Sequence, residues 1–294
     1  MTDATSSLSN FTGLIVLVGA GKMGGALLEG WLRCGLAAGR VAVLEPQPSP
    51  AVAALVRDGV RLNPQPRTLA GAAAIVIAIK PQAAGEVLPA LAPLVAKSTV
   101  VISIMAGRTL RFLAGALGTQ CAIVRAMPNL PAAIGRGITV ATARNADLNQ
   151  RELAGALLAA TGALEWTDDE AVMDAVTAVS GSGPAYVFLL AEALAEAGAA
   201  AGLPGPLADK LARETIAGAG ELLHRSALAP AALRENVTSP GGTTAAALAV
   251  LMAENGLKPL LTEAVAAATA RSRQLADGRT PQARLGTVTR RTYI

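Results

Sequence analysis

A glycine-rich segment near the N-terminus has the residue types and spacing of a dinucleotide-phosphate site. Residues 19–24 read Gly-Ala-Gly-Lys-Met-Gly and directly follow a short apolar run at residues 14–18. In this pattern, G-x-G-x-x-G, the first glycine makes a tight turn, the second lets the main chain approach a pyrophosphate, and the third lets the next helix pack closely on the strand. The helix N-terminus adds N–H groups that attract the anion. A glycine-rich turn built for packing alone is the alternative. The residues predicted to bind a dinucleotide are Gly19, Gly21, Lys22, Met23 and Gly24.

An acidic residue stands where this kind of site binds the adenosine ribose. Glu45 follows the apolar run at residues 41–44, and an acid about 20 residues beyond the glycine pattern accepts a hydrogen bond from the ribose 2′-hydroxyl. A carboxylate repels a 2′-phosphate, and the neutral donors in the following turn are Gln47 and Ser49. Glu45 therefore favours NADH over NADPH; a solvated loop acid is the alternative.

Three further loops follow predicted strands, at residues 79–82, 105–107 and 125–131. Ligands of open α/β sheets bind beyond the carboxyl ends of the strands, so we expect these loops to line the cofactor site. Prolines on both sides of Asn129 stiffen the last loop. A solvated loop lysine is an equal alternative for Lys80. The residues predicted to lie beside the cofactor are Ile79, Lys80, Pro81 and Asn129.

The second half of the chain contains a turn rich in glycine and hydroxyl groups. Residues 236–244 read Asn-Val-Thr-Ser-Pro-Gly-Gly-Thr-Thr and lead into an apolar helical stretch. Adjacent glycines expose successive main-chain N–H groups, and the helix N-terminus adds its dipole, so the turn is suited to a small carboxylate. An earlier segment, Ser-Gly-Ser-Gly-Pro at residues 180–184, is explained equally well as an ordinary helix start.

These segments need a sheet to position them. Short apolar runs predict strands at residues 14–18, 41–44, 75–79, 99–103, 122–125 and 138–141. Amphipathic stretches between them predict helices at residues 23–34, 51–57, 83–95, 109–117 and 148–160. Strands that are apolar on both faces and alternate with helices indicate a parallel sheet covered on both sides, which is a doubly wound α/β domain.

After residue 166 the pattern becomes helical. Residues 167–170, Thr-Asp-Asp-Glu, have the cap and the acids of a helix start. We therefore expect a disordered extension at residues 1–12, an α/β domain at 13–167, an all-helical domain at 168–276 and a basic tail at 277–294.

Composition excludes several classes of protein. The chain has 294 residues with 1 His, 2 Cys and 7 aromatic residues, so a zinc site, a disulfide framework and a base-stacking surface are all disfavoured. The net charge is +4, but residues 271–294 contribute +5 and the other 270 residues sum to −1. We expect no nucleic-acid partner, no metal and a cytoplasmic location. We expect no membrane span, because the most apolar stretch is interrupted by Glu192 and Glu196. His224 is interpreted as a surface or packing residue, and Cys34 and Cys121 as buried, inert thiols.

Taken together, the motifs resemble those of the pyrroline-5-carboxylate reductase family. The segments that carry the resemblance are residues 18–24, 79–82, 125–131, 180–186 and above all 237–244, and the likeness extends from residue 14 to about residue 275. The glycine pattern is shared by many dehydrogenases, whereas the last segment is specific.

The resemblance implies an enzyme that reduces 1-pyrroline-5-carboxylate to L-proline with NADPH or NADH. It also implies a Rossmann-type domain followed by a helical dimerisation domain, in a homodimer that assembles in many members into a decamer of five dimers. Thr244 is then the candidate catalytic residue, bonded to the ring nitrogen, and the partner subunit completes the pocket. The substrate site would comprise Ser239, Pro240, Gly241, Gly242, Thr243 and Thr244.

Two rival functions were weighed. The 3-hydroxyacid dehydrogenases share the two-domain architecture, but they carry a catalytic lysine in the helix after the glycine-rich segment of the second domain. That segment corresponds to residues 180–184 here, and residues 180–201 contain no lysine. The second rival function is a redox sensor that binds the dinucleotide without catalysing a reaction. An assay with pyrroline-5-carboxylate separates an enzyme from a sensor.

Overall fold

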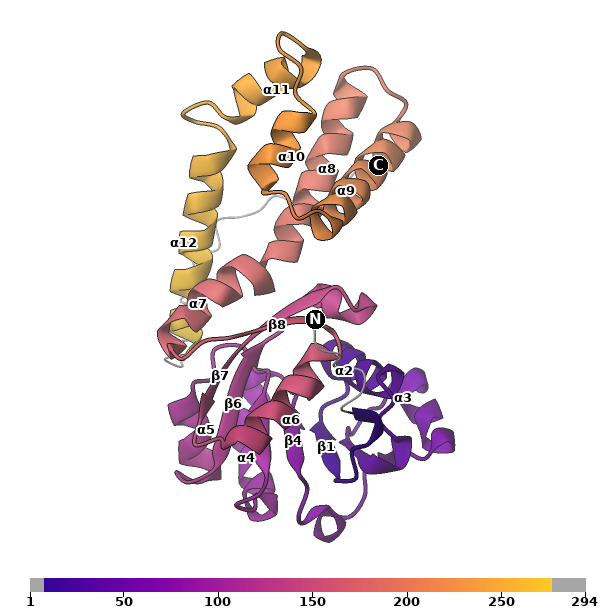
Figure 1. Ribbon diagram of the computed structural model, residues 1–294, viewed down its shortest axis with the longest axis vertical. Helices are drawn as coiled ribbons and strands as arrows, with labels where there is room; N and C mark the ends of the chain where they lie inside the picture. Colours follow the sequence, from indigo (N-terminus) through magenta and orange to yellow (C-terminus); the bar gives the residue numbers. More distant parts are fainter. Residues whose placement is uncertain (1–7, 277–294) are drawn as a thin grey trace.

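A computed structural model describes residues 8–276 of the chain as a sheet with helices on both faces and a helical layer beyond it (Figure 1). The sheet has the order β3-β2-β1-β4-β5-β6-β7-β8. Its strands are β1 (Ile15–Val18), β2 (Val41–Leu44), β3 (Arg61–Leu62), β4 (Ala74–Ile77), β5 (Val100–Ser103), β6 (Ala122–Met127), β7 (Gly137–Arg144) and β8 (Gly162–Trp166).

The strand order reverses beside β1, which pairs in parallel with β2 on one side and with β4 on the other. Ligands of doubly wound sheets bind at such a reversal, beyond the carboxyl ends of the strands. The predicted glycine turn begins directly after Val18 and therefore lies at this point. The predicted α/β fold is confirmed.

Two strands, β7 and β8, depart from the prediction of an all-parallel sheet, because they are parallel to each other and opposite in direction to the other six. β7 runs antiparallel to β6, with Met127 opposite Val140 and Ile123 opposite Arg144. The connection between these strands contains only a short 3-10 turn, Leu130–Ile134, and a parallel connection needs a dozen residues or more. β3 and β8 were also missed, because β3 has two residues and β8 alternates between half-buried and exposed positions at the edge.

Five helices follow or precede the strands of this half: α2 (Lys22–Arg33), α3 (Pro50–Ala54), α4 (Ala84–Leu91), α5 (Leu110–Leu117) and α6 (Leu148–Ala159). One core cluster joins β1, β2 and β5 to α2, α3 and α6, and includes Trp31 and Leu157. The other lies on the opposite face with α4 and α5, and includes Leu88 and Leu113. Trp31 is fully buried and its Nε1 donates to the carbonyl of Leu157 at 2.8 Å.

The N-terminal residues that the structure describes are packed. Leu8 is 1% exposed and belongs to the first core cluster, with Phe11 packed against it. The predicted disordered extension is therefore wrong for residues 8–12, where an apolar side chain is buried. Residues 1–7 and the predicted basic tail at 277–294 lie outside the described residues.

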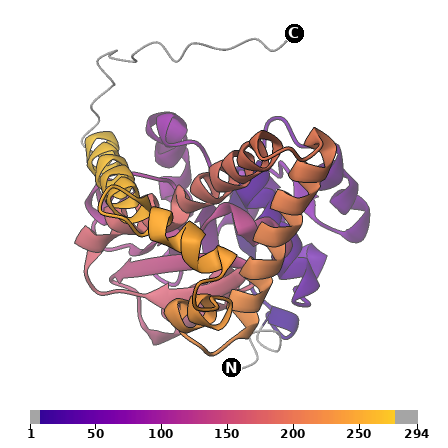
Figure 2. The same cartoon turned by 90° about the horizontal axis from the view of Figure 1, so that it is seen from above.

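The second half consists of α7 (Met173–Val176), α8 (Gly183–Ala200), α9 (Gly205–Arg225), α10 (Pro230–Asn236), α11 (Thr243–Leu251) and α12 (Leu257–Ala276), with a π-helical turn at Thr177–Gly181. Seen from above, α9 and α12 lie on opposite sides of this layer (Figure 2). α12 returns to α7, where the Ser272 hydroxyl donates to Asp174 Oδ1 at 2.6 Å. The predicted change from strands to helices falls between β8 and residue 170.

The helical layer exposes much apolar surface in a single chain. Phe188 is 54% exposed and Leu189 63%, although both lie in the middle of α8. The continuous helical run Glu170–Ala200 is long and apolar enough, by length and composition alone, to cross a membrane, and only 6% of its most apolar window is buried. A surface of this kind requires a cover.

Candidate functional site

The glycine turn after β1 has the conformation that a bound dinucleotide needs. Gly19 has φ +89°, and a Cβ there would lie 2.8 Å from the carbonyl oxygen of Ala78. A Cβ on Gly24 would lie 2.1 Å from the carbonyl oxygen of Gly19, so α2 can pack on the turn only through a glycine. A Cβ on Gly21 would meet nothing within 4 Å, so the space beside this residue is open. The first N–H groups of α2, at Lys22 and Met23, have no acceptor within the helix. The turn therefore fits a pyrophosphate.

Glu45 lies directly after β2 and its carboxylate reaches the glycine turn. Oε2 accepts a hydrogen bond from the Ala20 N–H at 2.8 Å, and Oε1 accepts one from the Gln47 N–H at 3.0 Å. The side chain is half-buried and fixed at the point where an adenosine ribose would lie, which favours the predicted role over that of a solvated loop acid. Ser49 instead caps α3, since its hydroxyl accepts from the Val52 N–H.

The loops after β4 and β5 are tied together by a residue that the sequence did not single out. Arg108 donates to the carbonyl of Pro81 through Nε at 3.2 Å and through Nη2 at 2.8 Å, and its guanidinium lies 4.5 Å from the Phe112 ring centroid. Lys80 is exposed and Ile79 is half-buried. Arg108 thus holds one predicted cofactor loop against the other. Only its position after the loop at residues 105–107 could have drawn attention to it.

The loop after β6 is anchored to the next strand. Asn129 Oδ1 accepts from the Ile138 N–H at 3.0 Å, and the Asn129 carbonyl accepts from the Ala132 N–H at 3.1 Å. These bonds give Asn129 a role in shaping the loop. Contact with a cofactor stays a prediction for this residue and for Ile79, Lys80 and Pro81.

The first glycine-rich segment of the helical half forms the π-helical turn. A Cβ on Gly181 would lie 2.4 Å from Met127 Cε, so this glycine lets β6 and the helical half approach closely. Tyr186 donates its hydroxyl proton to the carbonyl of Ala178 at 3.0 Å and braces the same turn. Gly181 and Tyr186 thus have packing roles, whereas the buried Ser180 Oγ has no hydrogen-bond partner among residues 8–276.

The second segment joins α10 to α11 and has the shape of an open anion-binding turn. Gly241 has φ +69°, and Gly242 is the N-cap of α11. The Gly242 N–H is taken by the carbonyl of Ser239 at 3.0 Å, so it is not free for a ligand as the sequence suggested. The first-turn N–H groups at Thr243 and Thr244 have no acceptor within the helix.

The two predicted sites lie apart within one chain. α11 stands at the end of the helical layer remote from the sheet, whereas the glycine turn lies on the sheet (Figure 1). The structure therefore brings together the predicted cofactor residues around β1, β2 and β4. It does not bring residues 239–244 to them.

A buried ion pair fixes the start of the helical half on the sheet. Arg125 of β6 is 5% exposed, and its Nη1 lies 2.8 Å from Glu170 Oε1. The same oxygen accepts from the Leu110 N–H at 2.8 Å. No sequence pattern predicts this pairing, because the two residues are 45 positions apart.

The remaining reactive side chains are not gathered into a site. Burial raises the pKa of the Cys121 thiol, whose Sγ donates to the carbonyl of Leu117; both cysteines are half-buried rather than buried as expected. His224 contacts Arg136 at the surface, and a hydrogen bond from Arg225 lowers the pKa of neighbouring Glu221. Among residues 8–276 no cluster of three or more metal-ligating side chains occurs.

Comparisons with known proteins agree with this architecture. Residues 170–275 match the family model for pyrroline-5-carboxylate reductase dimerisation, and residues 14–107 match the model described as NADP oxidoreductase coenzyme F420-dependent. The pyrroline-5-carboxylate reductase of Pseudomonas aeruginosa is 40% identical over 268 residues, which are 90% of this chain and 97% of that one. That of Synechocystis is 43% identical over 74% of this chain and 80% of its own.

The chain belongs to the pyrroline-5-carboxylate reductase family.

Solved structures of this family have the same fold. A pyrroline-5-carboxylate reductase from Coxiella burnetii superposes with a TM-score of 0.84 at 33% identity, covering 90% of this chain and 99% of that one. The Plasmodium falciparum enzyme, solved with NADP bound, gives 0.77 at 29% identity, covering 92% and 100%. The predicted family, reaction class and NAD(P)H use are confirmed.

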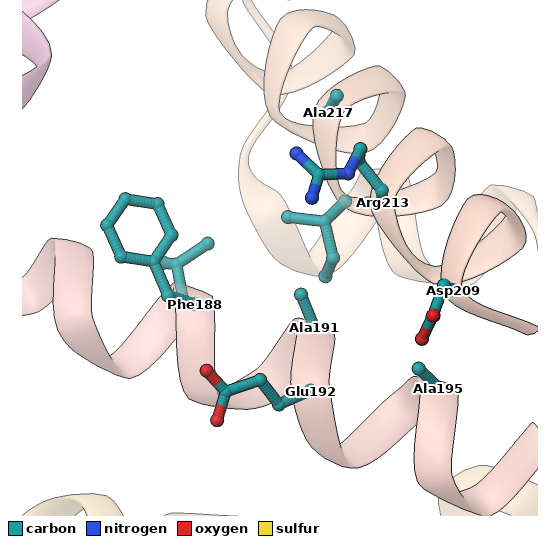
Figure 3. A pocket seen from close by; sticks show the side chains of 9 residues that line it. Phe188, Ala191, Glu192, Ala195, Asp209, Arg213 and Ala217 are labelled. Atoms are coloured by element: carbon teal, nitrogen blue, oxygen red, sulfur yellow. The ribbon is translucent and has the colours of Figure 1, made fainter. Parts of the chain in front are cut away.

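The dimerisation match also explains the exposed helical layer of this reductase. A hollow of about 640 Å³ lies between α8 and α9. In Figure 3 Phe188 and Glu192 of α8 line it on one side, and Asp209 and Arg213 of α9 line it on the other. The hollow lies within residues 170–275, the part of the chain that matches the dimerisation model.

Proposed function

We propose that this chain reduces 1-pyrroline-5-carboxylate to L-proline, the last step of proline biosynthesis, at a site shared by two protomers. Family membership assigns the reaction. The turn at residues 239–244, called the substrate turn below, is separated from the glycine turn in a single chain (Figure 1). This separation supports the shared site. When bound, the nicotinamide of NAD(P)H supplies the hydride.

The substrate turn binds the carboxylate and orients the ring. The first-turn N–H groups of α11 and the exposed Ser239 hydroxyl are aimed at an anion, and the helix dipole favours its charge. Thr244 is half-buried one residue further into α11, so its hydroxyl bonds the ring nitrogen and passes or stabilises the proton there. Little else is required, because orientation of two reactants supplies much of the acceleration in such a transfer.

The loops around the cofactor position it and supply no reacting group. Gly19, Gly21 and Gly24 shape the phosphate turn, whose N–H donors come from Lys22 and Met23. Arg108 keeps the loop at residues 79–82 on the loop after β5, and Asn129 keeps the loop after β6 on β7. Glu45 places a negative charge beside the ribose, so we propose NADH as the preferred cofactor.

The decisive experiment is a steady-state assay of NADH and NADPH oxidation with pyrroline-5-carboxylate. We expect turnover with both dinucleotides, a higher kcat/KM with NADH, and L-proline as product. Intact binding of both dinucleotides without turnover of this substrate would contradict the proposed reaction and favour a sensor.

Two broader features are proposed with it. The first is that five dimers assemble into a decamer. Sedimentation velocity at micromolar concentration would distinguish a decamer from a dimer. A cytoplasmic location follows from the biosynthetic reaction, and cell fractionation would test it.

A further inference from the structure

A surface asparagine beside Glu45 makes a reciprocal pair of hydrogen bonds with the main chain of that residue. Asn63 Oδ1 accepts from the Glu45 N–H at 2.9 Å, and Asn63 Nδ2 donates to the Glu45 carbonyl at 2.9 Å. The Asn63 N–H itself donates to the carbonyl of Val43 at 2.8 Å. β3 ends at Leu62, so the Asn63 side chain continues the pairing with β2 by one residue.

The backbone of Asn63 explains why this residue type is suited to the position. Its φ is +48°, a left-handed conformation that asparagine tolerates better than most residues with a side chain. An amide also offers one acceptor and two donors, and the reciprocal pair needs one of each. Asn63 is exposed, so the core does not depend on its side chain.

The reciprocal pair of hydrogen bonds between Asn63 and the main chain of Glu45, called the Asn63 clamp below, leaves Glu45 with little freedom. Its main-chain N–H and C=O are both bonded to Asn63, and its carboxylate is bonded to the N–H groups of Ala20 and Gln47. The carboxylate is thus held at the end of β1, while the main chain that carries it is held at the end of β3. A charge held in this way cannot swing aside to admit a second negative group.

We propose that Asn63 is a specificity-determining positioning residue, which fixes the Glu45 carboxylate against a 2′-phosphate on the adenosine ribose. The inference rests on the proposed use of NAD(P)H and deepens it. Without the clamp, Glu45 can turn toward solvent. The chain then loses hydrogen bonds to the ribose hydroxyls and also loses the repulsion of the phosphate.

The test uses fragments that contain only the adenosine half of the cofactor. Calorimetry would measure ADP-ribose and 2′-phospho-ADP-ribose binding to the full-length protein and to Asn63→Gly, because glycine keeps the positive φ and removes only the amide. We expect the ratio of the two dissociation constants, which favours ADP-ribose in the wild type, to fall by about three- to tenfold. This is the range that corresponds to the net contribution of one ordinary hydrogen bond. Asn63→Ala should show the same fall.

Asn145 provides the matched control. It is the other residue with a side chain and positive φ within residues 8–276, with φ +56°, and its Nδ2 donates to the carbonyl of Thr119 at 2.9 Å. It follows β7, which runs antiparallel to β6, and so lies beyond the amino ends of the parallel strands, at the end of the sheet opposite to Asn63. Asn145→Gly should leave the ratio of the two dissociation constants unchanged.

A double substitution tests whether Asn63 acts through Glu45. Glu45→Gln should lower the preference by itself, and adding Asn63→Gly should lower it no further, since the charge to be positioned is gone. Equal ratios in Asn63→Gly and wild type would overturn the proposal, as would full additivity in the double variant. The fragments carry no nicotinamide, so the binding measurement does not depend on turnover. An unchanged ratio would contradict the role of Asn63 alone, and absence of turnover in the reductase assay would contradict the proposed reaction alone.

Discussion

At the scale of single residues, the site works with glycines, hydroxyls and main-chain donors rather than with titratable groups. The sequence has one histidine, and His224 lies at the surface beside Arg136. The chemistry of hydride transfer belongs to the cofactor, so the protein contributes binding and orientation. In the proposed mechanism, Thr244 is the side chain that orients the substrate ring.

Thr244→Ala should lower kcat by roughly tenfold to a hundredfold and leave NADH affinity nearly intact, because the hydroxyl contacts the substrate only. Stopped-flow turnover and a fluorescence titration of NADH would measure the two effects. Thr244→Ser keeps the hydroxyl and should retain most of the activity. An unchanged kcat in the alanine variant would remove Thr244 from the mechanism.

Gly24→Ala should weaken dinucleotide binding at least about tenfold, because the new Cβ would lie 2.1 Å from the Gly19 carbonyl oxygen and push the turn away from α2. Gly25→Ala is the control, since its Cβ would be 3.7 Å from the nearest atom, the Ala20 carbonyl oxygen. Calorimetry with NADH would separate the two variants. Similar affinities for both would show that the close approach at Gly24 is not required.

At the scale of elements, the end of β6 fixes the helical half on the sheet. Arg125 pairs with Glu170 before α7, and Met127 contacts Gly181 after it. These residues are two positions apart on one strand, so a single short element touches both ends of the first helical segment. The predicted domain division at residues 167 and 168 falls just before this contact and stays a prediction.

Glu170→Gln should destabilise the protein by about 1–3 kcal/mol, because it leaves the Arg125 charge buried and unpaired; the cost is below that of a fully buried pair since Glu170 is partly exposed. Urea unfolding followed by circular dichroism would measure it. Glu165→Gln, on the exposed face of β8, is the control and should change stability little. A null effect at Glu170 would mean that the ion pair contributes nothing to stability.

At the scale of the whole molecule, the proposed shared site requires two chains. The turn before α11 stands at the far end of the helical layer (Figure 1). In a single chain, Phe188 and Leu189 of α8 are exposed. A second copy related by twofold symmetry would cover this surface and bring its own turn to the sheet. The dimerisation match over residues 170–275 agrees with this requirement.

Co-expression of Gly24→Ala with Thr244→Ala should restore about a quarter of the wild-type activity, because half of randomly formed dimers are mixed and each mixed dimer has one intact site. Each variant alone serves as the control and should keep at most about a tenth of the wild-type activity when NADH is well below saturation. Differently tagged subunits would allow the mixed dimer to be purified and assayed. No recovery in that dimer would show that each protomer uses its own substrate turn.

Several features could be predicted from the sequence because they depend on residues close together in the chain. The G-x-G-x-x-G turn, the alternation of apolar runs with amphipathic ones, and the helix start after Trp166 express local sterics and periodicity. Glu45 could be placed for the same reason, since it follows a strand at a fixed distance from the turn. Boundaries shifted by a few residues, and the two-residue strand β3 was too short to show a pattern.

Other features were decided only by the tertiary structure. The direction of β7, the Arg125–Glu170 pair, the Asn63 clamp on Glu45 and the separation of the two binding turns all depend on residues far apart in the chain. No local pattern records such contacts, because their free energy comes from burial and hydrogen bonding that exist only once the elements are packed. The candidate site residues could therefore be predicted from the sequence, whereas the residues that they contact could be identified only from the tertiary structure.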